Sequence, residues 1–215
     1  MKKLLTISLF LAAALVQTGC VVGRRTVDLP VPAMATGESG KGDIRITEVT
    51  DARQFMNEPS DPSIPSIDGD VTTMNEAIKS VMIGRQRNTW GQAMGDIALP
   101  VGQTVQERTQ KLIEEGLKQK GYSISTDMAS PNTAKVVVRE FWAWFTPGMW
   151  GVSFEAKINC LVTITVDGKI YEFTVSGYGK NVGQMASDAN WQKAYNIAFN
   201  DFMAKLSLTL EKNGL

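Results

Sequence analysis

The sequence has no histidine, only two cysteines and no excess of either charge, and these absences exclude several classes of protein. The chain has 215 residues, with 22 Lys and Arg against 22 Asp and Glu. Without histidine, a Ser-His-Asp or Cys-His catalytic apparatus and a histidine-containing zinc site are excluded. A formal net charge of zero argues against nucleic acid as a partner, because nucleic-acid binding needs a basic surface. The length suits one domain with its own core.

Long hydrophobic runs are also scarce, and the one that is present lies at the N-terminus. Lys2 and Lys3 precede an apolar run over residues 4–16 that is interrupted only by Thr6 and Ser8. A short basic start followed by such a run is typical of a secretory signal peptide. The run is shorter than the roughly 20 residues that a spanning helix needs. We therefore expect an exported protein with no membrane-spanning helix.

The end of this run indicates lipid attachment at Cys20. The sequence Gln17-Thr18-Gly19-Cys20 places a small residue directly before a cysteine, which resembles the bacterial lipobox, although Gln17 stands where leucine is usual. We predict a lipoprotein signal peptide over 1–19 and an acylated Cys20 as the only membrane attachment. Two or three acyl chains hold a protein at a membrane almost irreversibly. The alternative is an ordinary secreted protein, with Cys20 free or paired with Cys160.

The next segment, residues 20–42, is predicted to be a flexible tether, because it contains several glycines and prolines and few large apolar residues. The folded domain is expected over 43–215. Its first strand is predicted over 43–49, where Ile44 and Ile46 alternate with polar residues. Residues 57–70, with three prolines, are expected to form an exposed loop. A short helix is predicted over 73–79, followed by an extended piece, and another extended piece over 96–99.

Two helices are predicted from apolar stripes. The first spans 103–120, with a capping box formed by Thr104 and Glu107 and a stop at Gly121. The second spans 189–212, with Asp188 as its expected N-cap. Its aromatic residues are expected to pack against a sheet.

The C-terminal half also predicts an antiparallel sheet. A β-rich segment covers 134–144, a strand of perfect alternation covers 152–166, and a partner strand covers 169–178 after the Asp167-Gly168 hairpin signal. Alternation predicts one buried and one solvated face. The fold class is therefore α+β: a two-layer domain in which a mainly antiparallel sheet packs against two amphipathic helices.

The order of these features is similar to the YajG-like family of uncharacterised bacterial lipoproteins. The resemblance rests on Asp51-Ala52-Arg53, Ile83-Gly84-Arg85, Gly121-Tyr122-Ser123-Ile124 and a C-terminal helix that begins near Trp191. It covers residues 43–212 and implies an outer-membrane anchor, an α+β periplasmic domain and no known catalytic residues. Val21 follows Cys20 where aspartate would retain a lipoprotein in the inner membrane, so the outer membrane is expected, on its periplasmic face.

Catalytic chemistry in this sequence would depend on carboxylates or on Cys160. The carboxylates nearest to predicted strands are Glu48, Asp51, Glu140 and Glu155, but no spacing pairs them as a glycosidase requires. Cys160 lies on the apolar face of its strand and is expected to be an inert buried thiol. The segment Gly177-Tyr178-Gly179-Lys180 lacks the ending of a phosphate loop and is expected to end a strand. We expect no enzyme, no cofactor and no metal site.

An aromatic turn is the candidate contact surface. Trp142, Trp144 and Trp150 lie within nine residues, around the Pro147-Gly148 turn signal. Because a two-layer domain covers only one side of its sheet, one aromatic set is expected to be exposed and to contact a partner. The predicted function is a non-catalytic binding or assembly module of an envelope complex, with the membrane and envelope proteins as partners. The alternatives are a carboxylate-dependent envelope hydrolase and a carrier of a small lipid or glycan.

Overall fold

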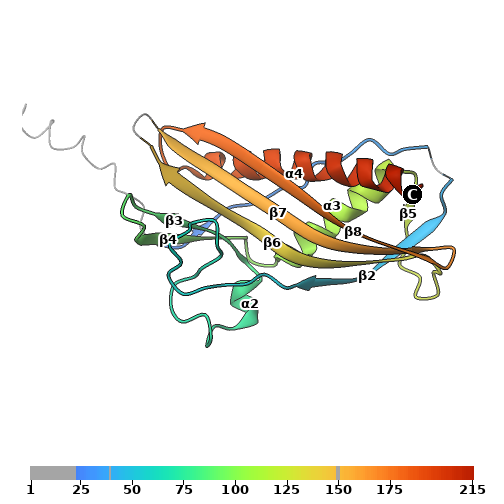
Figure 1. Cartoon of the computed structure of the whole chain (residues 1–215), viewed down its shortest axis with the longest axis horizontal. Helices are drawn as coiled ribbons and strands as arrows, with labels where there is room; N and C mark the ends of the chain where they lie inside the picture. The colour runs from blue at the N-terminus through green and yellow to red at the C-terminus, as the bar shows by residue number, and fades with distance from the viewer. Residues whose placement is uncertain (1–22, 39, 149–150) are drawn as a thin grey trace, which may run out of the picture.

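The computed structural model describes residues 23–38, 40–148 and 151–215. Within these ranges, one eight-stranded open sheet packs against three helices (Figure 1). The strands are β1 (Arg25–Thr26), β2 (Asp43–Asp51), β3 (Met82–Arg87), β4 (Ala93–Ala98), β5 (Ser123–Ile124), β6 (Thr133–Pro147), β7 (Val152–Val166) and β8 (Lys169–Gly183). The helices are α2 (Glu76–Lys79), α3 (Val105–Gln119) and α4 (Asp188–Lys212). None of these helices is long and apolar enough to cross a membrane. The predicted α+β fold class is confirmed.

Three long strands, β6, β7 and β8, form an antiparallel meander that makes up most of the sheet. The free side of β6 is shared: its first half pairs with β2 and its second half with β3, both in parallel. β4 continues the sheet antiparallel to β3, and β1 adds in parallel to β4. Residues 52–81 therefore leave the sheet after β2 and return to it at β3.

The alternation predicted for β7 and the predicted β7–β8 hairpin turn are both confirmed. Every second residue of β7 from Phe154 to Ile164 is buried, and the residues between them are half-buried. Asp167 and Gly168 join β7 to β8 with φ values of 50° and 76°. Positive φ at both positions is what a tight hairpin turn of the right twist needs.

The predicted ends of the helices are confirmed for α3 and corrected for α4. The Thr104 hydroxyl accepts a hydrogen bond from the Glu107 N–H at 3.2 Å, and the Glu107 carboxylate accepts one from the Thr104 N–H at 2.8 Å, which is the expected capping box. At α4 the N-cap is Ser187, whose hydroxyl accepts from the Asn190 N–H. Asp188 lies one residue inside, where its negative charge is favourable near the positive end of the helix dipole.

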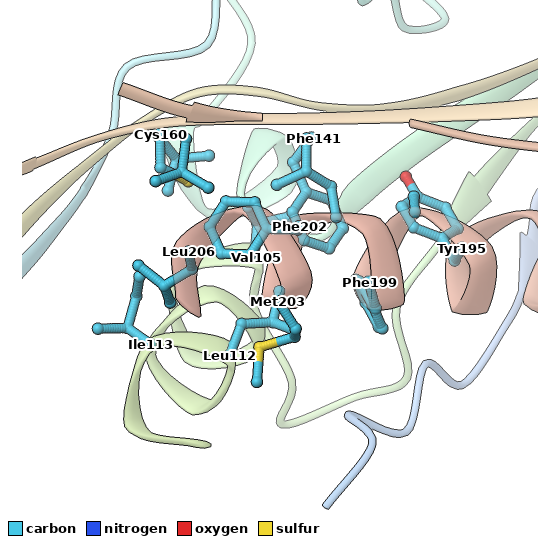
Figure 2. Close-up of a cluster of buried hydrophobic side chains, with 14 of the residues drawn as sticks. Val105, Leu112, Ile113, Phe141, Cys160, Tyr195, Phe199, Phe202, Met203 and Leu206 are labelled. Atoms are coloured by element: carbon cyan, nitrogen blue, oxygen red, sulfur yellow. The ribbon is translucent and has the colours of Figure 1, made fainter. Parts of the chain in front are cut away.

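The main core, which we call the inner core, lies between the sheet and α3 and α4. Figure 2 shows Phe141 and Cys160 facing Phe199, Phe202 and other side chains of α4. Phe141, Cys160, Phe199 and Phe202 are completely buried. The predicted burial of Cys160 is confirmed.

Glycines in β8 let α4 approach the sheet closely. A Cβ added at Gly179 would lie 2.1 Å from the Ala194 carbonyl oxygen, and one added at Gly177 would lie 2.3 Å from the Ala198 carbonyl oxygen. The prediction that this segment ends a strand is wrong, because β8 continues to Gly183. At these two glycines the backbone of α4 instead packs directly against β8.

A second core, which we call the outer core, covers the opposite face of the sheet at β3 and β6. Trp142 is 1% exposed and Trp144 is 9% exposed. The Trp142 indole N–H donates to the Pro62 carbonyl at 3.2 Å, and Phe55 packs edge-on against the Trp142 ring. The expectation that these tryptophans are exposed is therefore wrong, because residues 52–81 cover this part of the sheet as a third layer.

The N-terminal strap, residues 23–38, corrects the prediction of a free tether. Val27 and Leu29 are completely buried in the inner core. The Gly23 N–H donates to the Met94 carbonyl at 2.9 Å, and the Gly37 N–H donates to the Lys118 carbonyl at 3.1 Å. The folded body therefore begins at the strap and not at residue 43, while the predicted signal peptide over 1–19 lies outside the described residues.

Candidate functional site

A groove of about 700 Å³ lies on the outer face of β3 and β4, beside the outer core. Arg85 and Arg87 of β3 form its floor, since residues two apart in a strand share a face. Glu58, Pro59 and Asp68, from the segment between β2 and β3, line one side of the groove. The turn between β3 and β4, with Trp90, lines the other. We call this hollow the arginine groove.

Arg85 is buried between two carboxylates without a close hydrogen bond to either. Its side chain is 8% exposed, with Nε 3.4 Å from Asp96 Oδ1 and Nη2 3.7 Å from Asp68 Oδ1. Arg85 Nε and Asp96 Oδ1 are both buried and have no hydrogen-bond partner among the described residues. Burial raises the pKa of Asp96, and the Arg85 charge opposes that rise. Arg85 therefore keeps donor capacity that the protein does not use.

Arg87 is a buried cation that meets only neutral acceptors. Its guanidinium donates to the Pro59 carbonyl and, at 2.9 Å, to the Ser66 hydroxyl, and its Nε has no partner. Among the described residues, no carboxylate lies within ion-pair distance of Arg87, whereas the neighbouring Arg85 repels it. Burial, followed by the Arg85 charge, lowers the pKa of Arg87. The more distant carboxylates of Asp61 and Glu58 oppose this lowering of the pKa. An anion entering the groove would supply a direct ion-pair partner.

A hydrogen-bonded turn carries Trp90, which lines the arginine groove. The Asn88 carboxamide oxygen accepts from the Trp90 N–H at 3.0 Å and from the Gln92 N–H at 2.9 Å. Gly91, with φ of 79°, closes the turn. Trp90 itself is 83% exposed, which is unusual for so large an apolar side chain.

A smaller hollow of about 360 Å³ continues from the arginine groove to the start of the strap. Asp68, Arg85 and Ala93 line both hollows, and the smaller one adds Gly23 and Arg24. The start of the described chain is therefore next to the candidate site.

Arg53, in contrast, is an arginine with a structural role. Its guanidinium pairs with Asp51 at 2.8 Å and donates to the carbonyl oxygens of Lys79, Met82 and Phe141. These bonds join the end of β2 to β3 and β6. Arg53 has no donor capacity left for a ligand, which is why the arginines of β3 are the better candidates.

The other sequence-predicted candidates do not come together in a site. Cys20 and Trp150 lie outside the described residues, and Trp142 and Trp144 belong to the outer core. The candidate carboxylates bond to separate neighbours: Glu48 accepts from Thr50, Asp51 pairs with Arg53, Glu140 pairs with Lys157, and Glu155 accepts from Tyr178. Burial raises the pKa of the Cys160 thiol far above its usual range, so thiolate chemistry is disfavoured.

The sequence motifs do not predict the arginine groove, since Arg85 belongs to the Ile83-Gly84-Arg85 resemblance motif and Arg87 belongs to no motif. One signal was available: Arg85 and Arg87 alternate in a strand that begins with Met82 and Ile83. Two cations on one face of a largely buried strand need acceptors or a ligand. The residues that face them, 58–69 and Asp96, are not adjacent to them in sequence.

Comparisons with known proteins give distant structural likenesses. No family model and no curated protein matches the chain. The similar solved structures include an uncharacterised protein (11% identity, TM-score 0.44, 88% of this chain and 98% of that chain). They also include a Xanthomonas campestris protein of the DUF330 family (8% identity, TM-score 0.48, 89% and 96%). A third is a Helicobacter pylori protein described as a homologue of a neuraminyllactose-binding hemagglutinin (10% identity, TM-score 0.37, 88% and 94%).

Proposed function

We propose that this chain is an outer-membrane lipoprotein of the YajG-like type, anchored through Cys20 and facing the periplasm. Its domain is a non-catalytic binding module, and its binding site is the arginine groove. The signal-like N-terminus that ends at Gly19-Cys20 supports the anchor. The absence of histidine from the sequence and the burial of Cys160 support a non-catalytic role.

The binding role rests on one observation: the Arg87 guanidinium is buried and has no ion-pair partner among the described residues. A buried guanidinium without a carboxylate partner costs stability unless a ligand compensates for it. The open groove above it gives such a ligand access. Binding of an anionic group there is therefore the function that the geometry supports best.

The anchor is tested by metabolic labelling of cells with an alkyne fatty acid. The wild-type chain should be labelled and should sediment with outer-membrane fractions, whereas Cys20→Ala should be unlabelled and soluble. Cys160→Ala is the matched control, because it removes the other cysteine and should leave the label unchanged. Equal labelling of Cys20→Ala and wild type would refute the anchor.

A further inference from the structure

Only two residues separate the proposed anchor, Cys20, from Gly23, where the described part of the folded body begins. Cys20 stands three residues before Gly23, and the Gly23 N–H is hydrogen-bonded to Met94 at the start of β4. Three residues span at most about 11 Å when fully extended. If Cys20 is acylated, as the proposed function requires, the beginning of β4 lies about that close to the lipid surface. This short connection from Cys20 to Gly23 therefore determines which end of the domain faces the membrane.

That end, which we call the anchor end, gathers several segments. The Arg25 guanidinium donates to the Ala186 carbonyl at 2.6 Å and pairs with Asp188 at 2.7 Å, which places the start of α4 beside the strap. Figure 1 shows the β3–β4 turn, the end of β8 and the start of α4 at the end opposite the C-terminus.

Three apolar side chains at the anchor end are largely exposed: Trp90 at 83%, Val182 at 64% and Met185 at 67%. Tryptophan is favoured where a protein meets the headgroup layer of a bilayer. Exposed apolar residues also occur at the far end, where Ile170 is 72% exposed. Exposed apolar side chains alone therefore do not identify the end that faces the membrane, whereas the position of Cys20 does.

The charges of the arginine groove are mixed and not simply positive. Arg85 and Arg87 offer guanidinium donors on its floor, while the carboxylates of Glu58 and Asp68 lie in its lining. The Asp68 side chain is 90% exposed, and it lies 3.7 Å from Arg85 without a close hydrogen bond, so a solvent cation can reach it. Guanidinium groups suit phosphate oxygens, and carboxylates suit an ammonium group. A free phosphate would meet both carboxylates unfavourably, whereas a zwitterion would satisfy both sets of charges.

We propose that the anchor end docks on the bilayer that holds Cys20, and that the arginine groove takes a phosphoethanolamine headgroup. The phosphate lies against Arg85 and Arg87, the ammonium against Glu58 and Asp68, and Trp90 enters the headgroup layer. This inference rests on the proposed lipid anchor and adds an orientation and a ligand to it.

The test uses the full lipidated chain in vesicles rich in phosphatidylethanolamine that contain a lipid-borne quencher. A fluorophore is attached at Thr89→Cys, beside Trp90, or at Thr126→Cys, in the loop after β5 at the far end. Both positions are exposed in the protein, and the buried Cys160 and the acylated Cys20 should not react with the dye. We expect quenching at position 89 to exceed quenching at position 126 by at least threefold.

The headgroup is tested in the same vesicles with Arg87→Gln, with Arg139→Gln as a control at an exposed arginine on β6. We expect Arg87→Gln, but not Arg139→Gln, to reduce quenching at position 89 by half or more. Phosphatidylcholine, whose quaternary ammonium donates no N–H hydrogen bond, should have the same effect as Arg87→Gln. Millimolar inorganic phosphate in the buffer tests the other source of this anion and should leave quenching unchanged.

Each outcome separates the two proposals. Mass spectrometry that finds no acyl chains on the purified protein would refute the proposed anchor, whatever the fluorophores report. Acylated protein with equal quenching at both positions would refute the docking of the anchor end. Strong quenching at position 89 that ignores Arg87→Gln and the choice of lipid would refute the headgroup site, and so would the loss of quenching in inorganic phosphate.

Discussion

Replacing Leu29 by alanine distinguishes a packed strap from a free tether. Leu29 is completely buried in the inner core, although it lies within the segment for which the sequence favoured flexibility. The substitution removes three carbon atoms, each with a transfer free energy of about 0.8 kcal/mol. With the cavity that remains, the free energy of unfolding should fall by about 3 kcal/mol. For a domain of this size, such a loss lowers the melting temperature by about 6–12 °C.

The measurement is urea denaturation followed by tryptophan fluorescence, on the soluble Cys20→Ala chain with and without Leu29→Ala. Val101→Ala is the matched control, because Val101 is fully exposed and its truncation should change the free energy of unfolding by less than about 0.5 kcal/mol. If Leu29→Ala were as mild as the control, the strap would not be part of the core, and the short distance between Cys20 and the body would no longer follow.

Two further predictions concern the inner core. Gly179→Ala should lower the free energy of unfolding by about 2–3 kcal/mol, because its Cβ would overlap the Ala194 carbonyl and force α4 away from β8. Ser176→Ala in the same strand, on the opposite face, should be near neutral in the same urea titration, and an equally mild Gly179→Ala would contradict the close approach of α4. Cys160, as the only thiol of the Cys20→Ala chain, should react with a maleimide slowly in the native protein and rapidly in urea. Fast native labelling would mean that β7 faces the other way.

The parts of the fold that the sequence predicts well are those specified by neighbouring residues. The capping box of α3 needs only Thr104 and Glu107, and the β7–β8 turn needs only Asp167 and Gly168. The alternation along β7 likewise identifies its buried face from one strand alone. Each of these signals acts over a few residues, so no knowledge of the tertiary structure is required.

The errors arise where distant segments cover one another. The sequence predicts an exposed loop over 57–70, where prolines and polar residues separate the apolar side chains, and a short helix over 73–79. Neither prediction shows that apolar side chains from this segment, such as Phe55 and Ile67, together bury Trp142 and Trp144. The same layer supplies Pro59 and Ser66 to Arg87. The arginine groove thus depends on packing that periodicity does not reveal.

If Cys20 carries the proposed lipid anchor, the course of the strap also determines how the protein responds to mechanical force on that anchor. β1 runs parallel to β4, and the strap is held along its length by the bonds of Gly23 and Val27 to β4 and by the burial of Leu29. A pull toward Cys20, along the strand, slides β1 past β4 and strains these contacts together instead of peeling them apart one by one. Tension applied at Cys20 would therefore be transmitted through the strap to the hydrophobic interior.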